Sequence, residues 1–177
     1  MSKFGYKLVT GDVELQEAFE VRRQVFILEQ GISEDLVFDG RDREALHMVV
    51  KDGERVIGSA RVQLLADNQA KLERMAVLKR YRRKGIGREM LLFLDTVWKD
   101  KQVQQVIIHA QLEVVPFYKL CGFDEFGLPF QEAGIKHIKM RKRLCPCSPN
   151  DRRYRNRRSG TFLRFLSWDL SAQQYQL

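Results

Sequence analysis

The spacing of apolar residues separates predicted helices from predicted strands along most of the chain. Apolar positions three and four residues apart predict amphipathic helices over residues 10–31 and 85–98. A shorter helix is predicted over residues 113–123, with Pro116 in its first turn, where a missing N–H costs little. Alternating or β-branched apolar runs predict seven strands, at residues 6–9, 45–51, 55–65, 71–78, 105–111 and, on either side of Ala133-Gly134, within 124–144.

These elements follow one another in the order β-α-β-β-β-α-β-α-β-β, which indicates an α+β domain. Asp52-Gly53 is a dipeptide favoured in tight hairpins, and residues 32–45 have the composition of a loop. We expect the domain to occupy residues 1–144. Residues 145–177 are expected to form an Arg-rich linker and a C-terminal tail, in which a short amphipathic helix is one interpretation.

The formal charge of +8 is unevenly distributed. Residues 141–177 carry nine Lys/Arg and two Asp, a net charge of +7, so the other 140 residues have a net charge of only +1. A nearly neutral body lacks the general positive field of a nucleic-acid-binding domain. For the tail, a solvated segment is the preferred interpretation, and nucleic-acid binding through "RRYRNRR" is the alternative.

Several classes of protein are disfavoured by what the sequence lacks. No apolar run is long enough to span a bilayer, and the first residues lack the pattern of a signal peptide, so we expect a cytoplasmic protein without membrane contact. Three cysteines do not make a disulfide framework. Cys145 and Cys147 have no second Cys or His pair nearby, so no metal site is expected.

The stretch "RYRRKGIGREM" at residues 80–90 follows a predicted strand and runs into a predicted helix. Glycines allow backbone N–H groups to approach an anion, and a helix start adds unpaired donors and the positive end of its dipole. The stretch matches neither GxxxxGK[ST] nor the GxGxxG dinucleotide fingerprint. It therefore predicts a phosphate-binding turn of another kind, in preference to a solvated basic face or a localisation signal.

Arg82-x-x-Gly85-x-Gly87 resembles the pyrophosphate loop of the GNAT N-acetyltransferase superfamily, where such a turn follows the fourth strand and opens the third helix. Further blocks resemble a subgroup of small bacterial GNAT proteins: "VFILEQGI", "DGRDREALHMVV", "HAQLEVVPFYKLCGF" and "FQEAGIKHIKM". The resemblance covers about residues 5–143. It implies a mixed, mostly antiparallel sheet flanked by helices and splayed between strands four and five.

The resemblance also implies the residues that bind the donor, acetyl-CoA, as a co-substrate. Backbone groups on the fourth strand would hold the pantetheine arm, the glycine-rich turn would hold the pyrophosphate, and an aromatic pair would lie near the sulfur. These donor-binding residues are Met75, Ala76, Val77, Arg82, Arg83, Lys84, Gly85, Ile86, Gly87, Arg88, Phe117 and Tyr118.

For the chemistry, the resemblance implies that Tyr118 is a general acid, since a phenol is protonated at neutral pH. Glu73 is a candidate for the group that takes the amine proton; strand alternation places it on the face of Met75 and Val77. His137 is a rival for this role, as is His109.

Glu29 and Gln30 are candidates for lining the acceptor site. The activity implied is N-acetylation of a primary amine, on a small molecule or a peptide, by direct attack in a ternary complex. The alternative is an acyl-CoA-binding sensor or an inactive GNAT protein. Homodimers are common in the family, and the sequence does not specify the acceptor.

Overall fold

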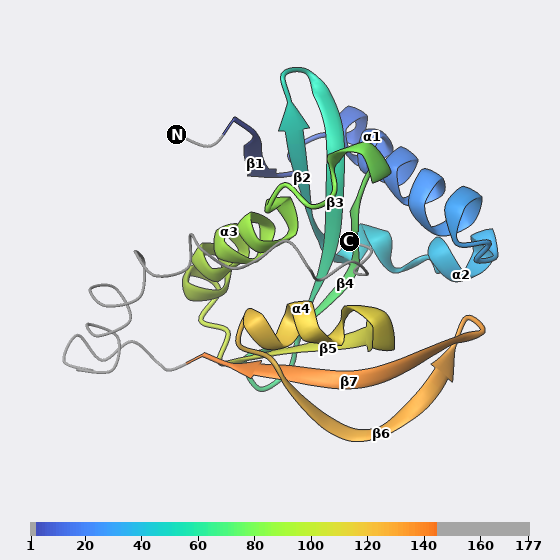
Figure 1. Cartoon of the computed structure of the whole chain (residues 1–177). Coiled ribbons are helices and arrows are strands. Elements are labelled where there is room, and N and C mark those ends of the chain that lie inside the picture. Colours follow the sequence, from blue (N-terminus) through green and yellow to red (C-terminus); the bar gives the residue numbers. More distant parts are fainter. Residues whose placement is uncertain (1–2, 145–177) are drawn as a thin grey trace.

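The computed structural model describes residues 3–144, which form one seven-stranded sheet with helices on both faces (Figure 1). The strand order is β1-β2-β3-β4-β5-β7-β6, and every neighbouring pair is antiparallel except the parallel pair β4–β5. The predicted α+β class and the mixed, mostly antiparallel sheet are therefore confirmed. The strands are β1 (Gly5–Leu8), β2 (Leu46–Asp52), β3 (Arg55–Leu65), β4 (Gln69–Val77), β5 (Gln105–Gln111), β6 (Asp124–Glu132) and β7 (Ile135–Arg143).

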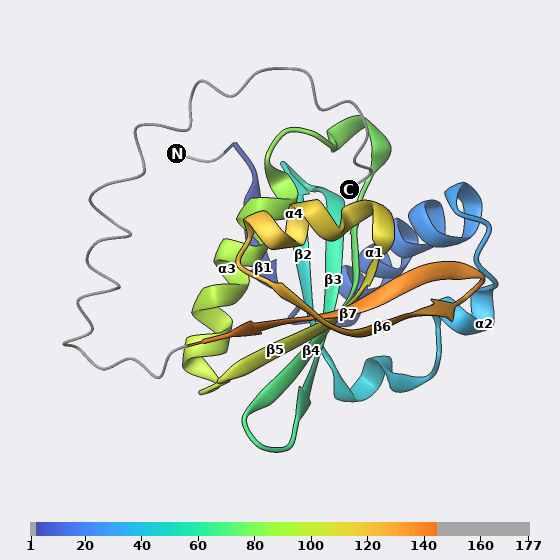
Figure 2. The ribbon, with the colours of Figure 1, turned by 60° about the horizontal axis from the view of Figure 1, so that its bottom comes forward.

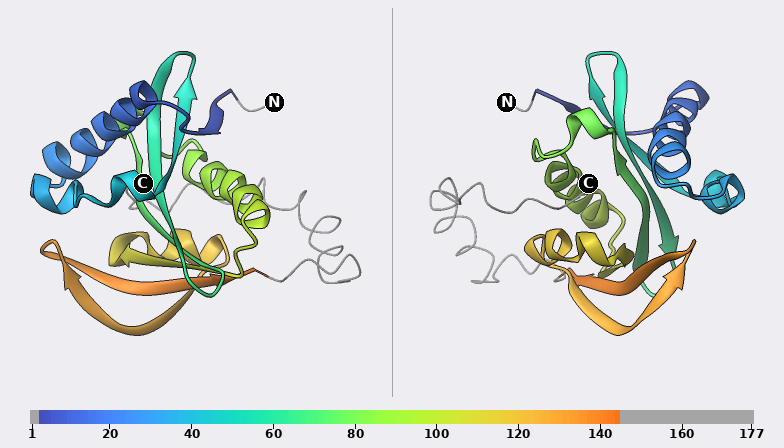
Figure 3. Two further views of the ribbon diagram at one scale, coloured as in Figure 1. Left: turned by 180° about the vertical axis from the view of Figure 1, so that it is seen from behind. Right: turned by 45° about the vertical axis from the view of Figure 1, so that its right-hand side comes forward.

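Two layers of helix cover the sheet. On one side of β2–β4 lie α1 (Asp12–Arg22) and α2 (Glu34–Val37), and on the other lie α3 (Ile86–Asp100) and α4 (Val115–Leu120) (Figure 3). The apolar stripe of α3 faces the sheet as its period predicts, because an amphipathic helix buries the face on which its apolar residues recur. The buried residues of α3 are Ile86, Met90, Leu91, Leu94, Val97 and Trp98.

The first predicted helix has a different geometry from the one that its periodicity suggests. After α1 the chain continues as a π-helix, η1 (Arg23–Glu29), before it ends near Gly31. The Gln30 N–H donates to Val25 O at 3.2 Å, five residues back. Single-turn π segments inside helices are frequent at functional sites, and η1 ends at the two residues expected to line the acceptor site.

The segment over residues 32–45 is more ordered than the loop that its composition predicts. It contains α2 and a 3₁₀ turn, η2 (Arg41–Glu44). Both elements span four residues, too few for a hydrophobic period to identify them. Their positions depend on contacts with distant arginines, described below.

The sheet divides into two parts, which separate beyond the paired first residues of β4 and β5. Figures 1 and 2 show β2–β4 running in one direction while β5, β7 and β6 cross beneath them. This is the splay expected between the fourth and fifth strands. Among residues 3–144, no helix is long and apolar enough to cross a membrane. The expectations for the linker and tail, including nucleic-acid binding, concern residues outside those described.

Candidate active site

The opening between β4 and β5 is the centre of the candidate site. The two strands pair only from Gln69 to Leu72, opposite Gln105 to Ile108. Farther along, β4 stays paired with β3 and β5 stays paired with β7. The edge of β4 beyond Leu72 therefore presents backbone groups that make no ladder with β5, and an extended ligand can hydrogen-bond to such an edge.

A β-bulge in β4 lies at this opening. Arg61 of β3 pairs with Glu73, whereas Ser59 pairs with Ala76, so β4 carries one extra residue between the two pairs. Arg74 lies in the bulge with φ of +51°, a region that side-chain-bearing residues rarely adopt. An extra residue reverses the alternation of side chains along the rest of the strand.

The bulge overturns the expectation that Glu73 shares a face with Met75. Met75 turns toward α4, and its Sδ atom accepts a hydrogen bond from Tyr118 Oη at 3.6 Å. Glu73 lies on the side of the sheet that α2 covers. Its Oε2 atom is 2.9 Å from Arg61, which also binds Asp39 between α2 and η2. The two side chains therefore lie on opposite sides of the opening.

The predicted phosphate-binding turn, residues 82–88, joins the short turn η3 (Lys79–Tyr81) to the start of α3. Arg83 and Gly85 have positive φ, +62° and +79°, and Gly85 is the N-cap of α3. The first backbone donor inside the helix is the Glu89 N–H, which donates to Gly85 O at 3.1 Å. The preceding N–H groups of the first turn point out of the helix, the geometry of an anion cradle.

Gly87 occupies a place where a side chain would not fit easily. A Cβ atom there would lie 3.2 Å from Phe117 Cζ and 3.6 Å from Met75 Cε. The start of α3, the bulge of β4 and the aromatic end of α4 therefore meet at Gly87. The structure thus brings three groups of predicted donor-binding residues together.

The Arg82 side chain makes contacts within the protein. Its two Nη atoms donate to the two carboxylate oxygens of Glu29, at 2.6 and 2.8 Å, and Nε donates to Val77 O at 2.9 Å. The hydrogen bond from Arg82 holds the pKa of Glu29 below its usual value. Arg82, which is predicted to bind acetyl-CoA, and Glu29, which is predicted to line the acceptor site, thus form one bidentate ion pair. This pair connects residues 82–88 to the end of η1.

Gln30, the residue after Glu29, contacts the opposite side of the opening. Its Oε1 atom accepts a hydrogen bond from Gln111 Nε2, at the end of β5, at 3.2 Å. Glu29 therefore contacts the β4–α3 connection while Gln30 contacts β5. The end of η1 spans the opening between the two strands.

Tyr118 lies on the α3 and α4 side of the opening. Its side chain packs edge-on against Phe117 and Phe123, with ring centroids 5.0 and 5.5 Å away, and only 6% of the residue is exposed. Burial raises the pKa of Tyr118. The phenol is therefore protonated at neutral pH, and it already donates to a sulfur atom, that of Met75.

His137 and His109 lie on neighbouring strands, β7 and β5, on either side of the Phe130 ring. His137 is buried, and its Nδ1 atom lies 2.9 Å from Ile135 O. His109 Nδ1 lies 2.7 Å from the carboxylate of Glu132, and this hydrogen bond lowers the pKa of Glu132. Sequence analysis missed Glu132, since it lies 23 residues from His109 and nothing in its local sequence marks it.

A buried ionic network, which sequence analysis also missed, borders the opening on the side of α1 and α2. Arg61, with no exposed side-chain surface, binds Asp39, Asp42 and Glu73 at 2.6, 3.2 and 2.9 Å. Arg22 of α1 is equally buried and lies 2.6 Å from Asp42. The hydrogen bonds from Arg61 hold the pKa of Asp39 well below its usual value.

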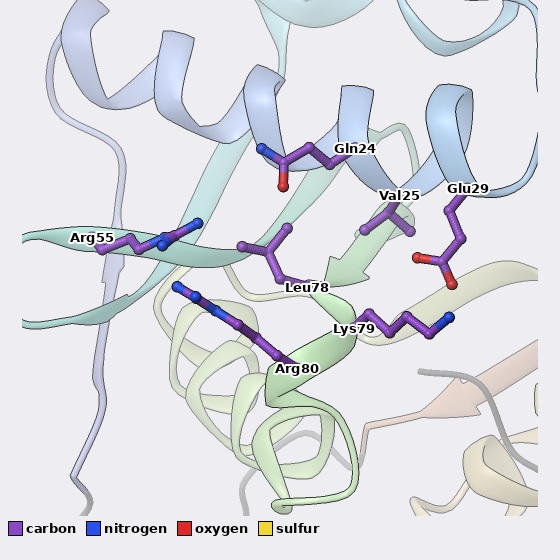
Figure 4. Close-up of a pocket in the computed structure, with 7 residues that line it drawn as sticks. All are labelled: Gln24, Val25, Glu29, Arg55, Leu78, Lys79 and Arg80. Carbon is purple, nitrogen blue, oxygen red and sulfur yellow. The ribbon is translucent and has the colours of Figure 1, made fainter.

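Two cavities lie outside the opening. One, of about 270 Å³, separates η1 from the start of β3 and from η3 (Figure 4). Its lining is Gln24, Val25, Glu29, Arg55, Leu78, Lys79 and Arg80, so it contains neither the start of α3 nor the aromatic residues of α4. The second, of about 640 Å³, extends from Arg88 along α3 to α4 and the end of β7, and its basic lining residues are Arg88, Lys119, Arg141, Lys142 and Arg143.

Known proteins resemble this chain over the whole described domain. The family model of the acetyltransferase (GNAT) domain matches residues 12–144. The uncharacterized N-acetyltransferase YjcF of Bacillus subtilis is 35% identical over 136 residues, which cover 76% of this chain and 96% of that protein. The crystal structure of the "putative N-acetyltransferase from Lactobacillus plantarum" is 27% identical and has a TM-score of 0.76, and the match covers 80% of this chain and 98% of that one. An acetyltransferase from Elizabethkingia anophelis, solved with acetyl-CoA bound, has the same fold, with a TM-score of 0.63, 15% identity, and coverage of 81% and 100%.

Proposed function

This chain belongs to the GNAT acetyltransferase family, and we propose that it transfers an acetyl group from acetyl-CoA to a primary amine by direct attack in a ternary complex. This proposal rests on one observation: the start of α3, the bulge of β4 and the aromatic residues of α4 contact one another at Gly87. A phosphate cradle, an open strand edge and a protonated phenol are the parts that an acyl-CoA donor requires. The Elizabethkingia anophelis structure with acetyl-CoA bound supports the choice of donor.

The donor binds mainly to backbone. The edge of β4 at Met75, Ala76 and Val77 holds the pantetheine arm, and an N–H group there polarises the thioester carbonyl. The N–H groups of residues 82–88 hold the pyrophosphate. Arg83, Lys84 and Arg88 supply positive charge, while Arg82 orients the loop through Glu29. The basic cavity that begins at Arg88 accommodates the phosphorylated adenosine end.

Tyr118 donates a hydrogen bond to the sulfur as the thiolate leaves. Its position beside Met75 Sδ supports this role. Burial raises the pKa of Tyr118, so the phenol stays protonated at neutral pH and acts as a hydrogen-bond donor to the sulfur. Glu73, His137 and His109 are the candidates for taking the amine proton, and Glu29 and Gln30 lie where η1 borders the acceptor side.

No covalent acyl-enzyme is needed. Cys121 is the free thiol among residues 3–144, and burial raises its pKa, so it carries little thiolate at neutral pH. Direct attack by the amine then depends on positioning and on stabilisation of the developing oxyanion.

Thermal unfolding in the presence of acetyl-CoA tests the donor site. At 100 times its dissociation constant a ligand stabilises by about 2.7 kcal/mol, which corresponds to roughly 5–10 °C for a chain of this size. Gly85→Glu should abolish the shift because it places a carboxylate where the pyrophosphate binds.

Gly85→Ala is the matched control for that variant. Both substitutions meet the same positive φ, and a Cβ atom at Gly85 has nothing within 4 Å, so the alanine variant tests backbone strain without the added charge. It should keep the shift. Equal stabilisation of the glutamate variant would show that residues 82–88 do not hold the donor.

Release of CoA in a panel of primary amines tests the transfer itself. Turnover with at least one amine is the expected result. A full thermal shift without turnover across peptide, polyamine and amino-sugar acceptors would instead support the acyl-CoA sensor.

A further inference from the structure

At the point where β4 and β5 separate, two ionisable side chains flank the opening. The last paired residues are Leu72 and Ile108, so the next residues along the two strands are Glu73 and His109. The neighbours of His109 on β5, Ile108 and Ala110, are buried, and His109 projects from the opposite face. His109 therefore lies on the side of the opening away from Tyr118, where an acceptor would approach the thioester.

His109 and Glu132 form a hydrogen-bonded dyad on this side. His109 Nδ1 lies 2.7 Å from Glu132 Oε2, and the Phe130 ring packs edge-on against the imidazole with centroids 5.0 Å apart. The hydrogen bond lowers the pKa of Glu132, so the carboxylate is ionised at neutral pH and accepts the Nδ1–H. In that tautomer Nε2 carries a lone pair, and no partner for it is found within residues 3–144.

Glu73 is less suited to accept a proton although it lies close by. Its Oε1 atom lies 2.6 Å from Lys71 Nζ, and its Oε2 atom binds Arg61. Burial alone would raise the pKa of Glu73, but the ion pairs with Lys71 and Arg61 outweigh burial and lower it. With both oxygens engaged and 9% of its side chain exposed, Glu73 is a weak and poorly accessible base.

The His137 ring is oriented by a carbonyl oxygen and not by a carboxylate. Its Nδ1 atom lies 2.9 Å from the carbonyl oxygen of Ile135, which orients the ring but carries no charge. Only 8% of the residue is exposed, whereas the His109 side chain is 24% exposed. Of the three candidates, His109 combines access with a carboxylate that stabilises the imidazolium.

We propose that His109, oriented by Glu132, takes the proton from the acceptor amine. Nε2 accepts the proton of an ammonium N–H, that bond breaks, and its electron pair stays on the nitrogen that then attacks. The nitrogen loses its second proton when the tetrahedral intermediate collapses, and that proton replaces the one that Tyr118 gives to the departing thiolate. The imidazolium is balanced by the Glu132 carboxylate and returns its proton to solvent before the next turnover. In this role His109 is catalytic and Glu132 is a positioning residue; the inference rests on the proposed acetyl transfer.

Several titratable groups lie around His109. Glu132 lies on β6, His137 and the cross-strand partner Lys139 lie on β7, and Lys71 lies on β4 beside Glu73. Of these groups, Glu132 is the one that makes a hydrogen bond with His109, so Glu132 is the group whose replacement tests the dyad.

Kinetics of His109→Gln, Glu132→Gln and the exposed control Lys136→Gln test the dyad. His109→Gln should lower kcat/KM by about 10²-fold or more, the scale of general base catalysis, and keep the acetyl-CoA thermal shift. Glu132→Gln should lower kcat and move the acid limb of the kcat/KM profile to lower pH. Lys136→Gln should match the parent protein.

An NMR titration of the imidazoles supplies a readout that needs neither donor nor turnover. The chain has three histidines, so their signals can be assigned by substitution. In Glu132→Gln the midpoint of His109 should move to lower pH, and that of His137 should move less. This measurement remains decisive if His109→Gln does not fold.

Two results would overturn the dyad: turnover of His109→Gln within threefold of the parent, or an unchanged His109 midpoint together with an unchanged pH profile in Glu132→Gln. Failure of the parent protein to bind acetyl-CoA or to turn over any amine would instead refute the proposed acetyl transfer. The two failures are therefore distinguishable.

Discussion

Replacing Arg61 with methionine should destabilise the domain strongly, because the arginine is the centre of a buried cluster of carboxylates. Its guanidinium binds Asp39 through both Nη atoms at 2.6 and 2.7 Å, and it also binds Asp42 and Glu73. Removing one partner of a buried ion pair costs about 3–5 kcal/mol, which corresponds to a Tm lower by roughly 6–20 °C for a chain of this length.

The loss should depend on pH in a defined direction. In the parent protein Arg61 lowers the pKa of Asp39. The stability that this ion pair contributes is fully present above the ordinary carboxyl pKa and is lost as the pH falls from that value through the lowered pKa of the folded protein. In Arg61→Met, Asp39 keeps its contact with Arg74 and Glu73 keeps its contact with Lys71, but both carboxylates lose the cation that they share, so their pKa values should rise from those in the parent protein. A substitution that raises a carboxyl pKa in the folded protein costs more stability as the pH rises from the lowered to the raised pKa, so the deficit should be larger at pH 7 than at pH 3.

Urea unfolding at the two pH values measures this effect as a difference in the free energy of unfolding. Arg55→Met is the matched control, since Arg55 is an exposed arginine at the start of the same strand, and it should stay within about 0.5 kcal/mol of the parent. A loss below 1 kcal/mol for Arg61→Met, or equal losses at both pH values, would refute the reasoning from burial and charge.

Three further substitutions address the proposed site. Tyr118→Phe should lower kcat by about 10²-fold or more while the thermal shift with acetyl-CoA is retained; an unchanged kcat would exclude the phenol as acid. Glu29→Gln should raise the KM for acetyl-CoA several-fold, because Arg82 loses its bidentate partner and residues 82–88 lose their fastening; steady-state kinetics with an unchanged KM would show that the pair is not needed. Cys121→Ser should leave kcat within about twofold of the parent, and trapping of an acetylated Cys121 by mass spectrometry would contradict direct attack.

The local sequence pattern was enough to predict the elements whose structure depends mainly on their own residues. The helix over 85–98 was predictable because its apolar residues recur with the helical period along a stretch long enough to show it, and α3 buries that stripe. A tight hairpin joins β2 to β3 as predicted, with Gly53 and Glu54 between the paired residues Asp52 and Arg55 and with Gly53 at φ of +59°. The strand order and the splay came from the family resemblance, which no periodicity could supply.

Features that depend on distant partners were not predictable in the same way. The bulge at Arg74 has no local signal, because a non-glycine residue with positive φ is set by the strand partner and by contacts of its side chain. Because this register shift was not predicted, Glu73 was expected on the wrong face of the strand. Pairs such as Glu29–Arg82 and His109–Glu132 join residues 53 and 23 positions apart, and only the fold brings them together.

If residues 32–45, which follow Glu29 and Gln30 in the chain, help to line the proposed acceptor site, that site should be more sensitive to distant charges than the proposed donor site. The proposed donor cradle is built from backbone at the start of a regular helix. Residues 32–45 are held against the sheet by side-chain contacts: Asp39 and Asp42 form ion pairs with Arg61, and Leu36 O accepts a hydrogen bond from Arg74 at 2.6 Å. Arg61→Met, studied at a temperature where it remains folded, should therefore raise the KM for the amine more than the KM for acetyl-CoA. Equal changes in both constants would mean that the network supports the whole sheet rather than the acceptor wall.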